Sequence, residues 1–156
     1  MSNQTVFGFY GSSNTGKTTV IVNIIKNLTD EGFNVATVKI TDKNIGLDTK
    51  GKDTWKFSKA GSKLVVLSSP SETDFLCKSK MNIEKTIQHI QNLSDCDIIL
   101  IEGAKDPSIQ KIRLGRNTKE RENTIISYTN NLNEVIEKIK GEIIKKKRSS
   151  RNQILI

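Results

Sequence analysis

Apolar residues occur along this chain in short runs separated by longer polar stretches. Val6–Tyr10 and Ile98–Ile101 are nearly continuous apolar runs, which is typical of strands buried on both faces of a sheet. Near the other end, apolar residues recur at helical spacing in Leu132–Lys147, which predicts a helix there. The same pattern predicts further strands and helices between these segments.

The remaining predicted strands are Asn34–Ile40, Lys63–Ser68, Lys111–Leu114 and Thr124–Tyr128, with Phe75 and Leu76 in a possible further extended piece. The remaining predicted helices are Lys17–Asp30, Thr54–Ala60 and Ile83–Leu93, with Gly32 as a C-terminal cap of the first. Strands alternate with helices, which favours an α/β fold with a mainly parallel sheet covered on both faces.

Between the first strand and the first helix lies Gly11-Ser12-Ser13-Asn14-Thr15-Gly16-Lys17-Thr18, which matches the phosphate-loop pattern G-x-x-x-x-G-K-[ST]. Gly11 and Gly16 allow a tight turn, and successive N–H groups with the helix N-terminus form an anion-binding nest. We expect Lys17 to reach the β- and γ-phosphates and the Thr18 hydroxyl to ligate Mg²⁺. The sequence therefore predicts nucleoside triphosphate binding in a three-layer P-loop NTPase-like fold.

Composition adds limits to this prediction. The length of 156 residues suits one domain, expected over residues 1–148, followed by a basic, flexible tail over 149–156. No apolar stretch approaches the ~20 residues of a membrane span, and no secretory signal is visible, so we expect a cytoplasmic protein. The net charge is +8, but aromatic residues make up only 5% of the chain, so nucleic-acid binding is not favoured. Cys77, Cys96 and the single histidine, His89, show no metal-ligand spacing.

Carboxylates following the predicted strands are candidates for metal binding, because ligands of parallel sheets lie at the carboxyl ends of the strands. Glu102 follows the buried strand and is the candidate to hold Mg²⁺ or its waters; the alternative is an ordinary strand-end carboxylate. Asp48 and the run Gly51-Lys52-Asp53-Thr54 form a second candidate cluster. Its alternative interpretation is a helix N-terminus capped by Asp53 or Thr54.

Three segments together resemble the MobB type of molybdopterin-guanine dinucleotide biosynthesis protein. They are Gly11–Thr19 with the following Gly32–Lys39, then Asp48-x-x-Gly51-Lys52-Asp53-Thr54, then Asp97–Lys105 with Lys111-Ile112-Arg113. The resemblance covers most of Val6–Arg116. The chain departs from the family pattern at Ile40, where a histidine is frequent, and at Ala104 and Gln110.

The resemblance implies a small GTP-binding protein with slow Mg²⁺-dependent hydrolysis, usually a homodimer, that acts beside a molybdopterin guanylyltransferase. It implies that Asp48 and Glu102 serve the metal and the attacking water. It further implies that Gly51, Lys52 and Asp53 contribute to an anion-binding surface for a second ligand, such as molybdopterin, or for a partner. The implied phosphate and Mg²⁺ residues are those of the loop: Gly11, Ser12, Asn14, Thr15, Gly16, Lys17, Thr18 and Thr19.

Two other functions stay open at this point. A P-loop kinase acting on a small acceptor would need a lid with arginines, and Lys111–Arg121 is the candidate segment. A nucleic-acid-binding protein switched by nucleotide would use the net positive charge of the chain to bind phosphate groups of the nucleic acid. No N-K-x-D run is present, so no motif shows whether guanine is preferred over adenine. Arg113 or Arg116 could supply a catalytic arginine across a dimer.

Overall fold

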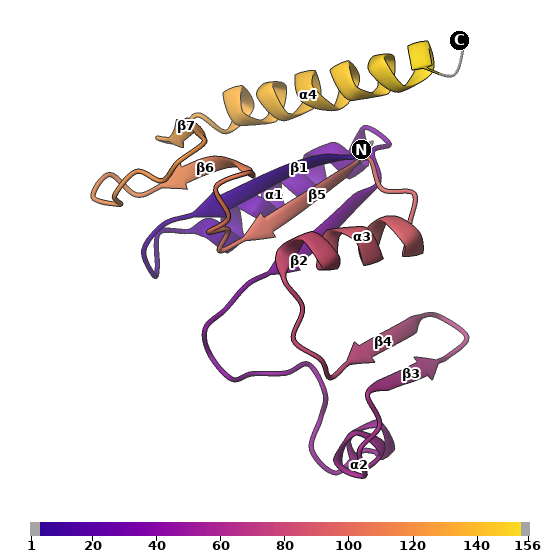
Figure 1. The fold of residues 1–156 in the computed structure, drawn as a ribbon. Coiled ribbons are helices and arrows are strands. Elements are labelled where there is room, and N and C mark those ends of the chain that lie inside the picture. The colour runs from indigo at the N-terminus through magenta and orange to yellow at the C-terminus, as the bar shows by residue number, and fades with distance from the viewer. Residues whose placement is uncertain (1–3, 154–156) are drawn as a thin grey trace. The chain divides into compact units, whose positions relative to one another are not determined.

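The computed structural model describes residues 4–153, with side chains for residues 4–149. The chain forms two compact units (Figure 1). The first unit comprises the residues up to Thr41 and those from Thr86 onward, and the second comprises Asp42–Lys85. The sequence pattern predicted one domain over residues 1–148 and gave no sign of this division.

The first unit contains a five-stranded sheet of order β2-β5-β1-β6-β7, in which every pairing is parallel. The strands are β1 (Thr5–Tyr10), β2 (Val35–Lys39), β5 (Ile98–Glu102), β6 (Gln110–Leu114) and β7 (Thr124–Tyr128). The predicted mainly parallel sheet is confirmed. Because Lys39 of β2 and Phe9 of β1 both pair with Glu102 of β5, the carboxyl ends of these strands lie level with one another.

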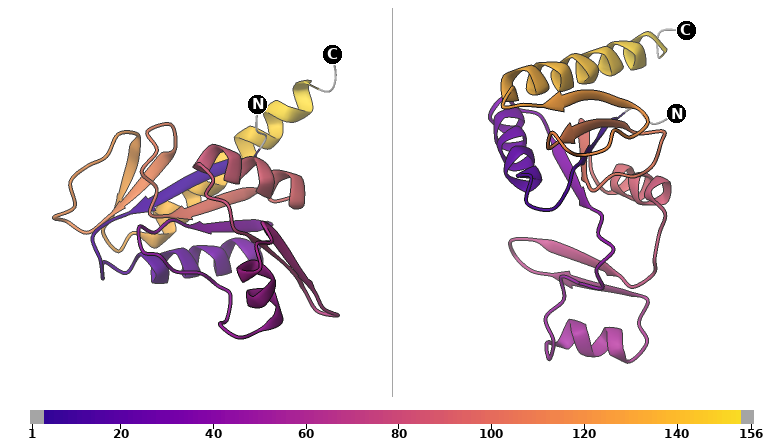
Figure 2. Two further views of the ribbon diagram at one scale, coloured as in Figure 1. Left: turned by 60° about the horizontal axis from the view of Figure 1, so that its bottom comes forward. Right: turned by 90° about the vertical axis from the view of Figure 1, so that its left-hand side faces the viewer.

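Helices cover both faces of this sheet (Figures 1 and 2). On one face α1 (Lys17–Asp30) and α4 (Leu132–Gln153) pack together, and residues 86–93 of α3 (Ile83–Leu93) lie on the other. The core between α1, α4 and the sheet contains fully buried side chains such as Phe7, Phe9, Ile24 and Ile139. Burial of such side chains contributes about 1.5–3 kcal/mol each to the stability of the unit.

Helix boundaries follow local signals. Helix α1 has the predicted bounds, and Gly32 adopts φ +84° just beyond it, as a left-handed C-terminal cap requires. Helix α4 extends to Gln153 instead of ending at Lys147, so residues 149–153 of the predicted tail are helical. The tail's last residues, 154–156, lie outside the described residues.

The second unit contains α2 (Asp53–Lys59) and an antiparallel hairpin of β3 (Leu64–Ser68) and β4 (Thr73–Cys77). Lys63–Ser68 was expected as a strand alternating with helices in the parallel sheet. It pairs instead with β4, because Ser69–Glu72 make a tight turn in which Ser69 N–H donates to Glu72 O at 2.9 Å. Within residues 4–153, none of the helices combines the length and the apolar character that a membrane span requires.

Candidate functional site

The phosphate loop lies between β1 and α1, at the carboxyl edge of the sheet. Its turn needs two left-handed residues, Asn14 at φ +61° and Gly16 at φ +77°, a conformation that costs asparagine and glycine less than other residues. Gly11 is required for a different reason. A Cβ at Gly11 would lie 2.4 Å from Leu114 O, so only glycine lets the loop pass β6 this closely.

Lys17 is the loop's cation. Its ammonium Nζ donates to Gly11 O at 3.0 Å and to Ser12 O at 2.6 Å. The Thr15 hydroxyl donates to the same Ser12 carbonyl at 2.9 Å. These bonds fold the lysine over the loop for which the sequence motif predicts a phosphate contact.

Thr18 and Glu102 meet beside the loop. The Thr18 hydroxyl donates to Glu102 Oε2 at 3.1 Å, and Lys39 Nζ lies 3.8 Å from the same carboxylate oxygen. Glu102 is held by its neighbour Gly103, whose N–H donates to Phe9 O at 2.8 Å and whose φ is +87°. A Cβ there would lie 2.6 Å from Ile40 O, so the backbone after the carboxylate requires glycine.

This pair of side chains fits a magnesium ion. Mg²⁺ prefers hard oxygen ligands and is usually held by one or two protein groups with waters and substrate phosphates. A threonine hydroxyl and a carboxylate in mutual contact at the phosphate loop supply such a set. Among the described residues no cluster of three or more His, Cys, Asp or Glu side chains is present, so phosphate oxygens and water would complete the coordination.

A shallow pocket of about 190 Å³ opens beside Thr18 and Glu102. Apart from these two and Lys39, it is lined mainly by aliphatic side chains of α1 and of the strands β2 and β5. Thr18 and Glu102 therefore lie at the polar end of an otherwise apolar groove.

On the other side of the phosphate loop lies the β6–β7 loop, residues 115–123. Thr118 links the two loops, because its hydroxyl donates to Leu114 O at 2.8 Å and accepts from Ser12 N–H at 3.4 Å. Gly115, at φ +88°, lies so close that a Cβ would come 2.9 Å from Thr15 Cγ2. No sequence motif pointed to Thr118, since a lone threonine in a polar loop carries no recognisable signal.

The β6–β7 loop is also fixed at its far end. Arg121 Nη1 donates to Ala104 O at 2.7 Å, and its guanidinium lies 4.7 Å from the centre of the Tyr10 ring. The Tyr10 hydroxyl accepts from Arg121 N–H at 2.9 Å and lies 2.7 Å from Thr124 Oγ1. Tyr10 precedes Gly11 directly, so this network connects the loop to the base of the phosphate loop.

These contacts bear on the lid proposed for a kinase. Lys111 is fully buried, and its Nζ donates to Ile109 O at 2.7 Å and to Glu122 O at 3.0 Å. This burial lowers the pKa of Lys111. Arg113 donates to Ser127 Oγ at 3.1 Å and lies 3.3 Å from Glu120. Because Lys111, Arg113 and Arg121 serve the fold of their own chain, these three cations are not available to close over phosphates as a lid requires.

The other predicted site residues belong to the second unit and form a cluster within it. Asp48 accepts from Thr54 Oγ1 at 3.0 Å and pairs with Lys78 at 3.3 Å. Burial raises the pKa of the Asp48 carboxyl, but these hydrogen bonds and the Lys78 charge outweigh it, and the pKa lies below its usual value. Gly51 has the φ of +91° expected for a tight turn.

The start of α2 differs from the sequence interpretation. The N-cap position is Lys52, without a side-chain cap bond, so neither Asp53 nor Thr54 caps the helix. Asp53 pairs with Lys56 at 3.0 Å, and Thr54 bonds to Asp48 instead. A pocket of about 520 Å³ within this unit is lined by Leu47, Asp48, Thr49, Lys52, Asp53, Thr54, Leu67, Asp74 and Leu76.

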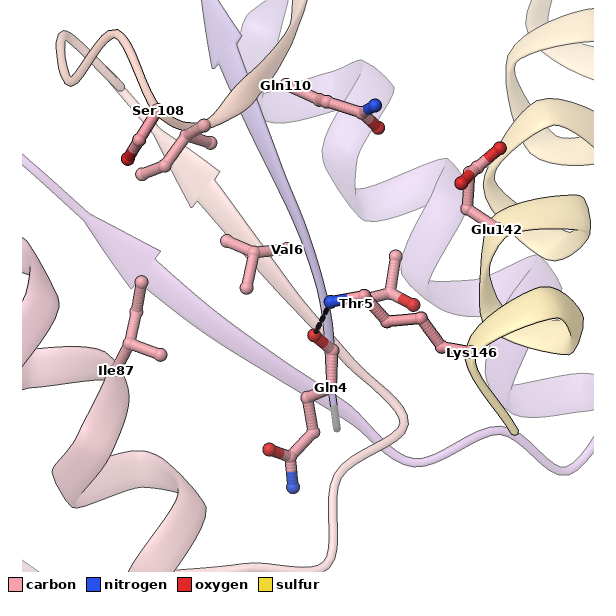
Figure 3. A pocket seen from close by; sticks show the side chains of 9 residues that line it. Gln4, Thr5, Val6, Ile87, Ser108, Gln110, Glu142 and Lys146 are labelled. Atoms are coloured by element: carbon pink, nitrogen blue, oxygen red, sulfur yellow. Dashed lines mark hydrogen bonds between the residues drawn. The ribbon is translucent and has the colours of Figure 1, made fainter. Parts of the chain in front are cut away.

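A further pocket, of about 390 Å³, lies near the amino ends of β1 and β6 (Figure 3). Val6, Gln110 and Glu142 line it, and Lys146 Nζ donates to Gln4 O at 2.7 Å at its rim. It adjoins the first described residue, Gln4, and lies at the end of the sheet opposite the phosphate loop. It therefore takes no part in the site formed by Lys17, Thr18 and Glu102.

Comparison with known proteins identifies the family of the chain. The family model of molybdopterin guanine dinucleotide synthesis protein B matches residues 6–138. The molybdopterin-guanine dinucleotide biosynthesis adapter protein of Haemophilus influenzae is 30% identical over 120 residues, covering 74% of this chain and 66% of that protein. A putative adapter protein of the same description from Methanocaldococcus jannaschii is 34% identical over 101 residues, covering 65% of this chain and 41% of that protein.

Solved structures show the same fold. The crystal structure of Bacillus subtilis MobB matches with a TM-score of 0.70 at 20% identity, over 88% of this chain and 99% of that one. A MobB homologue from Bacillus stearothermophilus matches with a TM-score of 0.64 at 16% identity, over 92% and 99% of the two chains. The chain spans only 41–66% of the length of the two curated relatives above. Since the family model covers most of its residues, the chain belongs to the MobB family.

Proposed function

We propose that this chain binds GTP with Mg²⁺ at Gly11–Thr18, hydrolyses it slowly, and acts as an adapter in the biosynthesis of molybdopterin guanine dinucleotide. The observation that carries the proposal is the meeting of Lys17, Thr18 and Glu102 at the carboxyl edge of a parallel sheet. In this arrangement one cation and two oxygen ligands face the same loop. Such a set suits a triphosphate and its metal ion.

Binding would exchange hydrogen bonds that the loop already makes. The Lys17 ammonium would leave the carbonyls of Gly11 and Ser12 for the β- and γ-phosphates. Amides of Asn14, Thr15 and Gly16, and those at the start of α1 up to Thr19, would donate to phosphate oxygens. Bound Mg²⁺ would neutralise phosphate charge, with Thr18 and Glu102 as its protein ligands.

Hydrolysis at this site would be slow. Glu102 could orient water, but a cationic side chain at the γ-phosphate, as supplied by an arginine finger, is worth about 10³–10⁵-fold in rate. Arg113, a sequence candidate for this role, is engaged with Ser127 and Glu120 of its own chain. Positioning and charge neutralisation by Lys17 would therefore account for most of the catalysis.

The second unit would bind the second ligand, molybdopterin, or the partner protein. The pocket beside Asp48, Lys52 and Asp53 has space for a ligand of moderate size. By resemblance to the family, this surface with Gly51 would meet molybdopterin or the guanylyltransferase that joins GMP to it. We also propose a cytoplasmic homodimer, on the resemblance alone.

Calorimetric titration of GTP, ATP, inorganic tripolyphosphate and molybdopterin tests the proposal. Lys17→Ala should abolish the nucleotide and tripolyphosphate signals and leave molybdopterin binding unchanged. Lys26→Ala is the matched control, since it removes one exposed lysine from the same helix. Wild-type protein that binds neither GTP nor tripolyphosphate in the presence of Mg²⁺ would contradict the proposed site. Equal affinity for ATP and GTP would contradict the assignment of GTP.

A further inference from the structure

The two sides of the phosphate loop differ in chemistry. Strand β1, which leads into the loop, lies between β5 and β6 in the sheet. On the β5 side the loop meets Glu102, whose carboxylate lies 3.8 Å from Lys39 Nζ, and on the β6 side it meets Thr118 and Gly115. The carboxylate, and with it the proposed metal, therefore belongs to one side only.

This asymmetry gives the bound nucleotide a direction. The β- and γ-phosphates must lie near Thr18 and Glu102, because both share the metal ion. The nucleoside is attached at the opposite end of the triphosphate. We therefore expect it to leave the loop away from Glu102, toward the carboxyl end of β6, because ligands of open parallel sheets lie along the carboxyl ends of the strands.

The chain segment at that position is held in place but presents exposed side chains. Thr118 and Gly115 fix its start to the phosphate loop, and Arg121 fixes its end to Tyr10 and Ala104. Between these attachments Arg116 and Asn117 are exposed. A fixed backbone with exposed polar side chains beside a ligand is the arrangement expected of a recognition loop, since little ordering entropy is lost on binding.

We infer that Gly115–Thr118 forms the nucleoside-side wall of the proposed nucleotide site, with Arg116 and Asn117 contacting the base and sugar. The planar guanidinium of Arg116 can stack on a base, and the Asn117 amide can both donate to and accept from its edge. Thr118 is a positioning residue, because it acts on the ligand only by tying this segment to Ser12. The inference rests on the proposed function and extends it to base recognition without an N-K-x-D run.

Tripolyphosphate separates contacts to the nucleoside from contacts to the phosphates. We expect Arg116→Ala and Asn117→Ala each to weaken GTP binding by about tenfold while leaving the affinity for tripolyphosphate within about twofold of wild type. Lys138→Ala is the matched control for the lost charge, since Lys138 is an exposed lysine of α4. It should change neither affinity.

Thr118→Val tests the positioning role. Valine keeps the branched shape but removes the hydroxyl that contacts Ser12 N–H and Leu114 O. The ratio of GTP to tripolyphosphate affinity should fall about fivefold, and Thr118→Ser should restore it. A thermal midpoint measured on each variant shows whether the fold is retained.

The outcomes separate this inference from the proposed function. Loss of GTP and tripolyphosphate affinity in equal measure in Arg116→Ala would make Arg116 a phosphate contact and overturn the inference. Unchanged GTP affinity in both Arg116→Ala and Asn117→Ala would also overturn it. A lower thermal midpoint in Thr118→Val with an unchanged affinity ratio would reduce Thr118 to a structural role. In each case the proposed phosphate site would stand, because it depends on tripolyphosphate binding and Lys17.

Discussion

Thr18 at the start of α1 donates a 3.1 Å hydrogen bond to Glu102 at the end of β5, although 84 residues separate them in the chain. The parallel pairing of β1 with β5 makes this contact possible, because it brings Glu102 level with Phe9, two residues before the phosphate loop. The register of the sheet therefore brings together Thr18 and Glu102, the proposed metal ligands.

Glu102→Gln should reduce the contribution of Mg²⁺ to GTP binding. Glutamine keeps the length and an acceptor oxygen for Thr18 but lacks the charge that a divalent cation requires. We expect the gain in GTP affinity on adding Mg²⁺ to fall about tenfold, measured by titration with and without the metal. Glu84→Gln removes an exposed carboxylate in the first turn of α3 and should leave this gain unchanged. An unaltered Mg²⁺ effect in Glu102→Gln would exclude Glu102 from the metal site.

Gly103→Ala should destabilise the protein and disturb Glu102. Alanine would adopt the unfavourable φ of +87°, and its Cβ would collide with Ile40 O at 2.6 Å, so the carboxylate would shift with the backbone. Left-handed strain alone costs about 1–3 kcal/mol, and the free energy of unfolding should fall by at least that much in urea titration.

Gly141→Ala is the matched comparison for this glycine. Gly141 lies inside α4, and an added Cβ would meet nothing within 4 Å. Because alanine favours the helix by about 0.5–1 kcal/mol over glycine, this variant should be more stable than wild type. Replacing glycine by alanine would then lower the free energy of unfolding at Gly103 and raise it at Gly141. Equal stability changes would show that the backbone at Gly103 is not strained.

Much of the first unit could be predicted from sequence, for physical reasons. β1 and β5 are buried on both faces, so their residues must be continuously apolar, and the glycine pattern of the loop follows from the turn it makes. The candidacy of Glu102 followed from its place after a buried strand. The contacts of Thr118 and Arg121 could not be predicted, because they depend on how the β6–β7 loop returns across the sheet.

The second unit was harder to interpret. Its hairpin is short and mostly exposed, so β3 lacks the apolar alternation that marks a half-buried strand. Asp48 and Thr54 are six residues apart across an irregular turn, and no periodicity indicates that they meet. The hydrophobic pattern carries no information about local contacts between polar side chains. The residues alone therefore indicated the cluster only as a candidate, with a capped helix N-terminus as its alternative.

Asp48→Asn should destabilise the second unit in a pH-dependent manner. The folded state lowers the pKa of Asp48 below its usual 3.8, so the ionised carboxylate stabilises the fold at pH values above 3.8. This stabilisation is lost as the pH falls through the lowered pKa. The variant should therefore be less stable than wild type at about pH 7, and the difference should narrow below pH 3.8.

Trp55 provides the measurement, because it is the single tryptophan of the chain and lies in α2 of the same unit. Urea unfolding followed by its emission at neutral and at acid pH reports on this unit. Asp53→Asn is the control, since the ion pair of Asp53 with Lys56 is exposed and contributes little. A stability difference for Asp48→Asn that is constant with pH would contradict the linkage to the carboxylate.

Phe75→Ser tests the proposed homodimer. The register of the hairpin places Phe75, Val66 and Leu64 on one face. Their exposed fractions are 52%, 47% and 53%, respectively. This exposed apolar face is therefore a candidate surface between copies of the chain. Light scattering should show a dimer for wild type and a lower mass for Phe75→Ser at the same concentration. Phe57→Ser is the matched control, since Phe57 is 57% exposed but belongs to α2. A dimer that persists in Phe75→Ser would remove the hairpin face from the interface, and a monomeric wild type would contradict the dimer itself.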